Sequence, residues 1–513
     1  MNNPDILSIG TLADGILAAT SGPVFGIPGG GASLELLDAL EQKGGDFVRT
    51  HFEGCASLMA GTVGRMSGRP GACLSIKGPG LANMVPGLAA SALESFPLLA
   101  ICEAFPRDTA WRERHKGMDH SELAAAVSKG AFGLAGERVV ESAVALAAAE
   151  VPGPVVLNLN DSKATPPPSE AEDEAIDTVM RHVEMARQPV VIAGSLAVRS
   201  AWSKHLKNLT VPVFVTASAK GVLDETLPYA AGVYTGVGLE RTPESTILPK
   251  ADLVIGLGLR AKEVLAAKAF SCPSVNIDPV QSDRSFEFAA TARTKSVEPV
   301  LNALTSSDWG ADLIANSLTQ LDSVLFSTEF LPAHVFATIA HHFTGCVRGV
   351  FDTGNFCTIA EHIWRPRRSD LCLMSGQGRY MGTGLPMAIA AAEYDTSIPT
   401  IAFLGDGGIG MYLAEAKIAA ERSLPLLICL LSDGGYGSVR SRAIRDGLTQ
   451  TPLIIDQPSW LAAIEGMGIP GIFASSEESL VSALQSWDPT SGPRYLEISF
   501  DSNAYQGMVN GVR

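Results

Sequence analysis

The sequence predicts an α/β protein of three consecutive domains, each with a doubly wound parallel sheet at its centre. Two observations carry this prediction. Short apolar runs that end in glycine-rich turns alternate with helical patterns along the chain. The length of 513 residues is too great for one hydrophobic core and fits about three domains. We expect the domains at residues 1–163, 176–304 and 330–513.

In the first block, five apolar runs are expected to form the strands of one sheet. The first run breaks at Pro28 and is followed by a helical pattern, and the third ends just before Lys77. A helix rich in small residues is expected to start at Glu53. The expected strands are 24–27, 47–51, 72–76, 98–103 and 154–160, and the expected helices are 32–41 and 53–66.

A linker and a second block follow. Residues 161–175 contain three consecutive prolines and a cluster of acids, which makes them the clearest linker in the chain. Residues 302–331 are less regular, and Pro332 is expected in the first turn of a helix that opens the last block. The expected strands of the second block are 189–193, 211–216, 253–257 and 274–277.

The last block contains two acidic turns that follow neighbouring apolar strands. The strand 400–404 runs into a glycine-rich turn with Asp406, and the strand 425–431 ends in a similar turn with Asp433. Parallel strands joined by a helix end at the same edge of a sheet, so the two acids are expected side by side. Gly-Asp-Gly alone is usually a turn with an aspartate that caps a helix. The second acidic turn favours a site instead.

The residue types in these turns suit a divalent cation and a phosphate. Two carboxylates and the carbonyl of a glycine, here Gly435, offer the oxygen ligands that Mg²⁺ prefers. Glycines after Asp406 free main-chain N–H groups at the start of a helix, where phosphate binds well. The segment therefore predicts a site for Mg²⁺ and a diphosphate.

Composition limits the other classes of partner. The net charge of −16 argues against nucleic acid or an anionic membrane. The eight cysteines are irregularly spaced, which favours reduced thiols over a disulfide or zinc framework. No signal peptide is expected at the start, and prolines and an acid interrupt the most apolar window, 84–104. We expect a soluble cytoplasmic protein that acts on a small molecule.

Several motifs resemble the thiamine-diphosphate (ThDP) enzymes, over nearly the whole chain and in the family's order. Glu53 alone would be explained as an acid that complements a helix dipole. The residues after it resemble the family's pyrimidine-binding domain, namely Gly61, Arg65, Gly68, Pro70, Gly71, Gly78, Pro79, Gly80 and Asn83. Similar segments are 25–30, 191–194, 276–279, 375–386 and 405–433. The chain is most similar to the branch of acetolactate synthases and benzoylformate decarboxylases.

The resemblance implies roles for particular residues. Glu53 falls at the position of the glutamate that binds the aminopyrimidine ring and activates the cofactor, and Met381 at that of the apolar residue that holds it bent. Asp406, Asp433 and the Gly435 carbonyl would bind Mg²⁺. Further cofactor contacts are implied at Pro28, Gly29, Gly354, Asn355, Gly378, Gly407, Gly408 and Tyr436. Many relatives have two asparagines in place of Ser432 and Asp433, but aspartate also offers a hard oxygen ligand.

The family's reaction is attack on a 2-oxo acid, loss of CO₂ and formation of an enamine. The enamine is then protonated to an aldehyde or joined to a second carbonyl compound. We therefore expect a decarboxylase or carboligase for a small 2-oxo acid, with an acetolactate-synthase-type transferase as an alternative. A non-catalytic regulatory relative is the alternative from another class. In this family the glutamate and the diphosphate site come from different subunits, so a homodimer or homotetramer is implied.

The substrate contacts and the flavin question stay open at this level. Candidate substrate residues are Gly30, Lys77, His115 and His120, of which the two histidines could donate a proton to the enamine. Lys77 could equally be a solvated loop lysine, and the basic run of Arg107, Arg112, Arg114, His115 and Lys116 could be solvated surface. Acetolactate synthases carry FAD in the middle domain. The turn 256–260 is a weak signal for it and lacks the expected arginine-rich continuation, so FAD is not expected.

Overall fold

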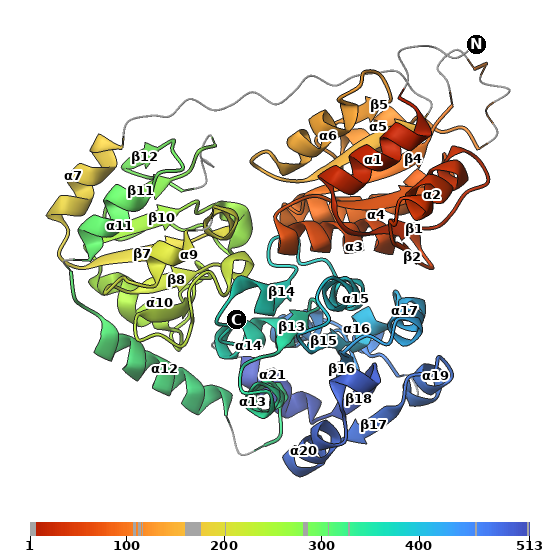
Figure 1. The fold of residues 1–513 in the computed structure, drawn as a ribbon. Helices are drawn as coiled ribbons and strands as arrows, with labels where there is room; N and C mark the ends of the chain where they lie inside the picture. The colour runs from red at the N-terminus through yellow and green to blue at the C-terminus, as the bar shows by residue number, and fades with distance from the viewer. Residues whose placement is uncertain are drawn as a thin grey trace. The chain divides into compact units, whose positions relative to one another are not determined.

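Three six-stranded parallel sheets organise the computed structural model and confirm the predicted fold class (Figure 1). The structure describes residues 7–105, 109–110, 114, 116–159, 176–200, 202–280, 286–305, 307–326, 329–456, 459–509 and 512. The predicted linker 161–175 and three members of the basic run, Arg107, Arg112 and His115, lie outside these residues. None of the described helices combines the length and the apolar character needed to cross a membrane.

The chain divides into two compact units. The first contains the N-terminal sheet together with Leu385–Ser397 and Tyr412–Leu426, and the second contains the central and C-terminal sheets. Each unit is described by itself. The division follows contacts and not sheets, so the domain boundaries expected from the sequence stay a prediction.

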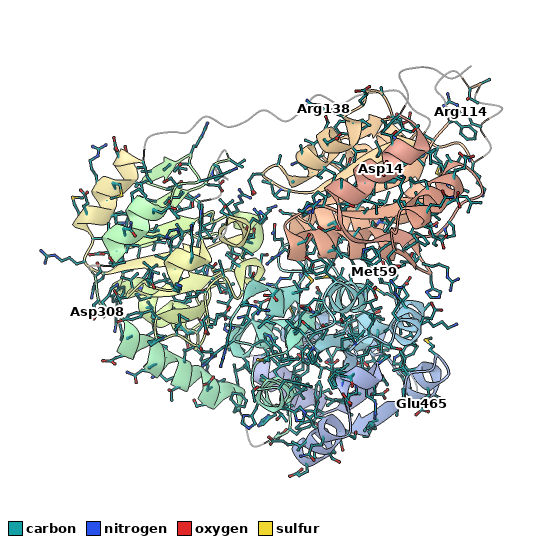
Figure 2. All side chains as sticks on the ribbon, viewed as in Figure 1. Asp14, Met59, Arg114, Arg138, Asp308 and Glu465 are labelled. Carbon is teal, nitrogen blue, oxygen red and sulfur yellow. The ribbon has the colours of Figure 1, made fainter. Side chains whose placement is uncertain are left out.

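The N-terminal sheet has the strand order β2-β1-β3-β4-β6-β5. Apolar side chains of α1, α2 and α6 form one core with its strands, and α3 and α4 pack closely on each other. Met59 of α3 is completely buried, whereas Asp14 of α1 is exposed (Figure 2). The strands are β1 Ser21–Gly26, β2 Phe47–Arg49, β3 Gly71–Ser75, β4 Leu98–Glu103, β5 Ala131–Gly133 and β6 Pro154–Leu159. The helices are α1 Ile9–Ala19, α2 Ala32–Gln42, α3 Glu53–Ser67, α4 Pro79–Glu94, α5 His120–Ala125 and α6 Val139–Ala148.

The central sheet has the order β12-β11-β10-β7-β8-β9, which in chain order is the 3-2-1-4-5-6 pattern of dinucleotide-binding folds. The expectation that residues 302–331 are less regular was wrong, because this segment contains the 15-residue helix α12. The strands are β7 Pro189–Ala193, β8 Val213–Val215, β9 Ala230–Val233, β10 Leu253–Leu257, β11 Ser274–Ile277 and β12 Ala290–Ala292. The helices are α7 Asp177–Met185, α8 Ser195–Arg199, α9 Ser203–Leu206, α10 Pro243–Ile247, α11 Glu298–Leu304 and α12 Ala311–Leu325.

The C-terminal sheet has the order β14-β13-β15-β16-β18-β17, which is the same pattern as in the N-terminal sheet. Helix α13 begins at Pro332 as predicted. The strands are β13 Arg348–Phe351, β14 Cys372–Met374, β15 Thr400–Gly405, β16 Leu426–Ser432, β17 Gly471–Ala474 and β18 Arg494–Ser499. The helices of the second unit that follow α12 are α13 Pro332–His342, α14 Asn355–Ile363, α16 Asp406–Ile409, α18 Gly437–Arg445, α19 Leu461–Glu465, α20 Glu477–Gln485 and α21 Ser502–Val509. Helix α15, Gly384–Tyr394, and helix α17, Ala416–Glu421, belong mainly to the first unit.

An aromatic cluster fixes the ends of two strands of the C-terminal sheet. Phe351 of β13 stacks on Phe403 of β15 with ring centroids 4.8 Å apart, and Phe336 of α13 meets Phe403 edge-on at 5.0 Å. All three rings are completely buried. Such packing holds both strand ends rigidly, so the polar residues that follow them have fixed positions.

Candidate functional site

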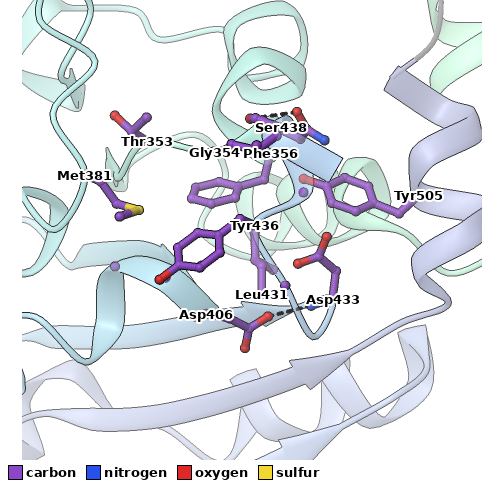
Figure 3. A pocket seen from close by; sticks show the side chains of 17 residues that line it. Thr353, Gly354, Phe356, Met381, Asp406, Leu431, Asp433, Tyr436, Ser438 and Tyr505 are labelled. Carbon is purple, nitrogen blue, oxygen red and sulfur yellow. Dashed lines mark hydrogen bonds between the residues drawn. The ribbon is translucent and has the colours of Figure 1, made fainter. Parts of the chain in front are cut away.

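A cavity of 160 Å³ lies at the carboxyl edge of the C-terminal sheet, where β13, β15 and β16 end (Figure 3). In a sheet with the order 2-1-3-4, this edge beside the first strand is the usual position of a ligand. The predicted cofactor residues that line it are Gly354, Asn355, Met381, Asp406, Gly407, Gly408, Asp433, Gly435 and Tyr436. The structure therefore gathers nine residues from distant parts of the chain around one cavity.

Asp406 ties the two acidic turns together. Its Oδ1 accepts a hydrogen bond from the Ser432 hydroxyl at 2.8 Å, and its Oδ2 accepts from the main-chain N–H groups of Asp433 and Gly434, both at 2.9 Å. The carboxylate is buried. The side-by-side arrangement that the parallel strands predict is thus present, and Asp406 sets the course of the second turn.

Asp433 has a carboxylate oxygen that receives no hydrogen bond from the described residues. Its Oδ2 is buried and has no hydrogen-bond partner among the described residues, while a Cβ on Gly437 would lie only 2.7 Å from it. Burial, and then the neighbouring Asp406, raise the pKa of Asp433 to about 7. A buried carboxylate oxygen without a donor is costly, and a bound cation would remove that cost.

The donor set suits Mg²⁺. No group of three or more His, Cys, Asp or Glu side chains in the described parts of the chain is arranged to hold a metal. Mg²⁺ needs no such group, because it is commonly held by one or two carboxylates together with phosphate oxygens and waters. Asp406, Asp433 and the Gly435 carbonyl therefore fit this ion in chemical type.

Glycine is required at two positions of the turn after β15. A Cβ on Gly408 would lie 2.0 Å from Asp352 Oδ2. A Cβ on Gly407 would lie 2.6 Å from the Tyr436 ring and 3.0 Å from the sulfur of Met381. The turn can approach these three side chains only because both residues lack a Cβ. This close approach is what a diphosphate cradle built from main-chain N–H groups needs.

Asp352 is a site residue that the sequence interpretation missed. It is completely buried directly after β13, and its carboxylate accepts from the N–H of Thr353 at 2.8 Å and of Gly382 at 2.9 Å. Burial raises the pKa of Asp352 to about 7. Because Gly382 follows Met381, this acid fixes the main chain beside Met381. Its position after a buried strand is the signal that also marks Asp406.

Two further features of the cavity were not expected from sequence. Tyr505 of α21 lines it, so the last described helix takes part in the wall. The Asn355 Oδ1 accepts from the Ser438 hydroxyl at 2.9 Å, which joins α14 to α18. Gly378 does not line the cavity. It lies in a loop where Ser375 Oγ accepts from the N–H of Tyr380 at 2.7 Å.

Glu53, the predicted catalytic residue, is the first residue of α3 in the first unit. Its side chain is only 7% exposed, and its Oε2 accepts from the Asn83 amide of α4 at 3.0 Å. Helices α3 and α4 approach closely, since a Cβ on Gly87 would lie 2.0 Å from the Gly54 carbonyl oxygen. Asn83, given above only as part of a motif, is therefore the residue that orients Glu53.

The loop after β1 holds Pro28, Gly29 and Gly30. The N–H of Gly29 donates to Ser33 Oγ at 3.1 Å, and a Cβ on Gly30 would have nothing within 4 Å. Ser33 in turn donates to the buried Glu103, through its main-chain N–H at 3.0 Å and its hydroxyl at 2.5 Å.

Lys77 is engaged with the same acid. Its ammonium lies 2.8 Å from Glu103 Oε2, and its side chain is 25% exposed. Lys77 is therefore not a freely solvated loop lysine. Its charge is already paired with Glu103, so a substrate would not have this cation to itself.

His120 supports the turn after β3. Its Nε2 accepts from the N–H of Gly78 at 2.9 Å, and its Nδ1 lies 2.8 Å from Asn158 Oδ1. An Nε2 that accepts carries no proton, so this pattern assigns the proton to Nδ1. Gly78 has φ +64°, and a Cβ there would lie 1.9 Å from the Lys116 carbonyl oxygen. In this arrangement His120 fixes a tight turn, and its Nε2 has no proton to donate.

In a sheet with this strand order, a flavin dinucleotide would bind at the carboxyl edge of the central sheet. Glu263 lies at the switch point between β7 and β10, where it accepts from Ser195 N–H at 2.7 Å, Ser195 Oγ at 2.5 Å and Thr216 Oγ1 at 2.8 Å. Arg260 and Asp278 form a buried bidentate pair with both hydrogen bonds at 2.9 Å.

The turns at this edge are also closed on each other. A Cβ on Gly194 would lie 2.3 Å from the Gly258 carbonyl oxygen and 3.0 Å from Glu263 Oε2. A dinucleotide pyrophosphate binds at such an edge by taking donors that the protein leaves free. Here Glu263 and Asp278 already engage the donors of Ser195, Thr216 and Arg260, so these residues do not fit a flavin.

The fold and the cavity together define an α/β protein with a cavity whose residue types would suit a phosphorylated cofactor and a divalent cation. The chain belongs to the family of thiamine pyrophosphate enzymes. Residues 11–126 match the family's N-terminal TPP binding domain, residues 176–304 its central domain and residues 352–498 its C-terminal TPP binding domain. The family and the domain order expected from the motifs are thus confirmed.

The relatives of known name are distant but cover almost the whole chain. Acetolactate synthase of Bacillus subtilis is 25% identical over 529 residues, which span 95% of this chain and 91% of the relative. The large subunit of acetolactate synthase isozyme 2 of Escherichia coli is 24% identical, over 93% of this chain and 92% of its own length. A catabolic acetolactate synthase of Raoultella terrigena is also 24% identical, with the same coverage.

Proposed function

We propose that the protein is a ThDP- and Mg²⁺-dependent enzyme that decarboxylates a small 2-oxo acid. The acyl carbanion equivalent that remains is either protonated and released as an aldehyde or transferred to a second carbonyl compound. The observation that carries the proposal is the buried Oδ2 of Asp433, which has no partner in the described part of the chain and lies beside Asp406 in the cavity. A folded protein keeps such an uncompensated group mainly where a ligand completes it.

The residues of the cavity divide into three tasks. Asp406, Asp433 and the Gly435 carbonyl would hold Mg²⁺, and Gly354, Asn355, Gly407 and Gly408 would surround the diphosphate. Met381, fixed through Gly382 by Asp352, would support the cofactor's rings. When bound, ThDP supplies the nucleophilic carbon and the electron sink that decarboxylation of a 2-oxo acid requires.

Glu53 would exchange a proton with the aminopyrimidine ring. Its carboxylate is buried and oriented by Asn83, which leaves its Oε1 as the atom to carry that proton. A protein that only bound the cofactor would have no use for this buried glutamate, so the arrangement disfavours a non-catalytic relative. In the family the glutamate and the diphosphate pocket belong to different subunits, so we propose a homodimer or homotetramer with the active site between subunits.

Two outcomes of the reaction are proposed. The named relatives are all acetolactate synthases, which favours transfer to a second carbonyl compound and a hydroxyketone product. In the other outcome a proton ends the reaction and the product is an aldehyde. His120 is not the proton donor in the arrangement described, since its Nε2 accepts from Gly78.

The test combines CO₂ release from a panel of 2-oxo acids with product analysis and a Glu53→Gln variant. We expect turnover with ThDP and Mg²⁺, and a loss of about 10²–10⁴-fold in Glu53→Gln with ThDP affinity kept, because only proton exchange is removed. Glu35→Gln is the control, since Glu35 is an exposed acid in the first turn of α2. Unchanged turnover in Glu53→Gln would overturn the role of Glu53, and no turnover on any acid would favour the non-catalytic relative.

A further inference from the structure

The main chain just before Glu53 is held by a carboxylate from a distant part of the sequence. Glu415 Oε1 accepts from the N–H of His51 at 3.1 Å and of Phe52 at 3.0 Å. Its Oε2 lies 3.2 Å from the same His51 nitrogen and 3.4 Å from His51 Nδ1. All these residues belong to the first compact unit. Glu415 therefore fixes the two residues that lead into α3.

Helix α3 has no cap of its own that could do this. Its N-cap residue is Phe52, whose side chain accepts no hydrogen bond, whereas many helices begin at a serine, threonine or aspartate. Glu415 is only 1% exposed, and burial and then the nearby Glu415 raise the pKa of the thiol of Cys55, in the first turn of α3. A buried acid from outside the helix thus replaces the missing local cap.

A second contact from the same segment supports the same two residues. The ring of Tyr412 stacks on Phe52, with centroids 5.8 Å apart and planes 16° from parallel. The Phe52 ring also lies close to Gly54, where a Cβ would be 2.4 Å from the ring. The Glu415 carboxylate and the Tyr412 ring together fix the position of Phe52. Glu53 is the next residue in the chain.

Burial of Glu415 shows that the contact is specific. Loss of solvation raises the pKa of Glu415, and hydrogen bonds from His51 oppose that rise. A buried acid is costly unless its hydrogen bonds are well made. The neighbouring acid Glu421 of α17 is different, because its pair with Arg49 is exposed and has a long separation of 3.5 Å.

We propose that Glu415 is a positioning residue for Glu53. It sets the start of α3, and through it the direction in which the Glu53 carboxylate points. The inference rests on the proposed function, in which Glu53 exchanges a proton with the cofactor. Glu415 itself touches neither the cofactor nor the substrate in this account. It acts only through the main chain of His51 and Phe52.

Amide hydrogen exchange in the cofactor-free protein tests the contact without any reaction. In Glu415→Ala the amides of His51 and Phe52 lose their acceptor, so we expect their exchange to be faster by about 10-fold or more. Glu415→Gln keeps one acceptor oxygen, and its exchange should stay near that of the wild type. Glu421→Ala is the matched control and should leave these amides unchanged.

Steady-state kinetics then separates positioning from simple support of the fold. A shift of the acid by about 1 Å can cost roughly 10²-fold in rate, so we expect the kcat of Glu415→Ala to fall at least about 10-fold with KM nearly unchanged. Glu415→Asp keeps the charge but withdraws it by one methylene, and should fall in the same direction. It also carries the test if Glu415→Ala does not fold. Glu415→Gln should restore most of the turnover.

The results distinguish this inference from the proposed function. If Glu53→Gln keeps full turnover, the role of Glu53 fails whatever the Glu415 variants do. If Glu53→Gln is impaired while Glu415→Ala and Glu415→Asp turn over like Glu421→Ala, the positioning role alone is overturned. Faster amide exchange without loss of kcat would have the same meaning, because Glu415 would then only stabilise the fold.

Discussion

The carboxyl edges of the C-terminal and central sheets carry similar residues and differ in one respect. Both edges have acids close behind parallel strands, Asp406 and Asp433 at one, Glu263 and Asp278 at the other. At the central edge Glu263 accepts from Ser195 and Thr216, and Asp278 pairs with Arg260. At the C-terminal edge the Oδ2 of Asp433 has no partner among the described residues.

The comparison teaches that acids at a sheet edge do not by themselves mark a ligand site. A ligand site is marked by acids whose oxygens receive no hydrogen bond or ion pair from the protein itself. At the central edge, hydroxyl groups and a guanidinium donate hydrogen bonds to the acids, so these acids contribute to the fold and not to ligand binding. At the C-terminal edge Asp406 is satisfied, but Asp433 Oδ2 receives no hydrogen bond from the described residues, and several glycines in the cavity wall leave room for a ligand. A satisfied edge stabilises the protein, and an unsatisfied one is available for binding.

The largest effect is expected for Asp406→Ala. This change removes a proposed metal ligand and the three hydrogen bonds that hold Ser432, Asp433 and Gly434. Hydrogen bonds to a charged group contribute about 1.5–3 kcal/mol each, so ThDP should bind about 100-fold more weakly or worse. Calorimetric titration with ThDP and Mg²⁺ measures this. Retained affinity would mean that the metal site lies elsewhere.

A smaller effect at the same edge is expected for Gly408→Ala. The new methyl group would lie 2.0 Å from Asp352 Oδ2, so the turn must move. Overpacking costs about 1–3 kcal/mol, which predicts ThDP binding about 10-fold to 100-fold weaker. Gly410→Ala is the control, because its Cβ would make ordinary contacts at 3.5 Å with Trp460. Equal affinities for the two variants would contradict the steric argument.

The central edge should respond in the opposite way. Glu263→Ala leaves the donors of Ser195 and Thr216 without their acceptor, so the free energy of unfolding should fall by about 1–3 kcal/mol per group left unsatisfied. ThDP affinity should stay at the wild-type value, because these residues serve only the fold. Thermal melting and the same titration measure both quantities. Weaker ThDP binding with an unchanged melting temperature would break the comparison.

The smallest effect, none at all, is expected from FAD. Purified protein should show no flavin in its visible absorption spectrum, and added FAD should leave turnover unchanged. The reason is that Glu263 and the Arg260–Asp278 pair occupy the edge where a dinucleotide would bind. Stoichiometric flavin in the purified protein would show that this edge opens and would remove the contrast between the two sheets.

The elements with long buried runs could be predicted from the sequence. Strands β4, β15 and β16 are runs of six or seven residues that are nearly all buried. Strands that escaped prediction are shorter, for example β5 and β12 with three residues each, and the Ala-Thr-Ala of β12 contains only one strand former, Thr291. Helix α12 was overlooked although Ile314, Leu318, Leu321 and Leu325 recur at helical spacing along it.

The candidate site shows the same limit. The acids and glycines next to strands β15 and β16 could be predicted, since topology alone brings strand ends together. The contacts of Asp352 with Gly382, of Tyr505 with the cavity and of Glu415 with the start of α3 depend on tertiary packing between segments far apart in the chain. No local pattern specifies such contacts.

We propose that Asp433 Oδ2, which has no partner among the described residues, binds a cation that holds the cofactor. The most direct measurement is the dissociation constant of ThDP for the wild type and for Asp433→Ala, with Mg²⁺ and after its chelation. We expect chelation to weaken ThDP binding by the wild type about 100-fold or more, and to change the already weak binding of Asp433→Ala little. Equal wild-type affinity with and without Mg²⁺, or an equally large effect of chelation on Asp433→Ala, would contradict the claim.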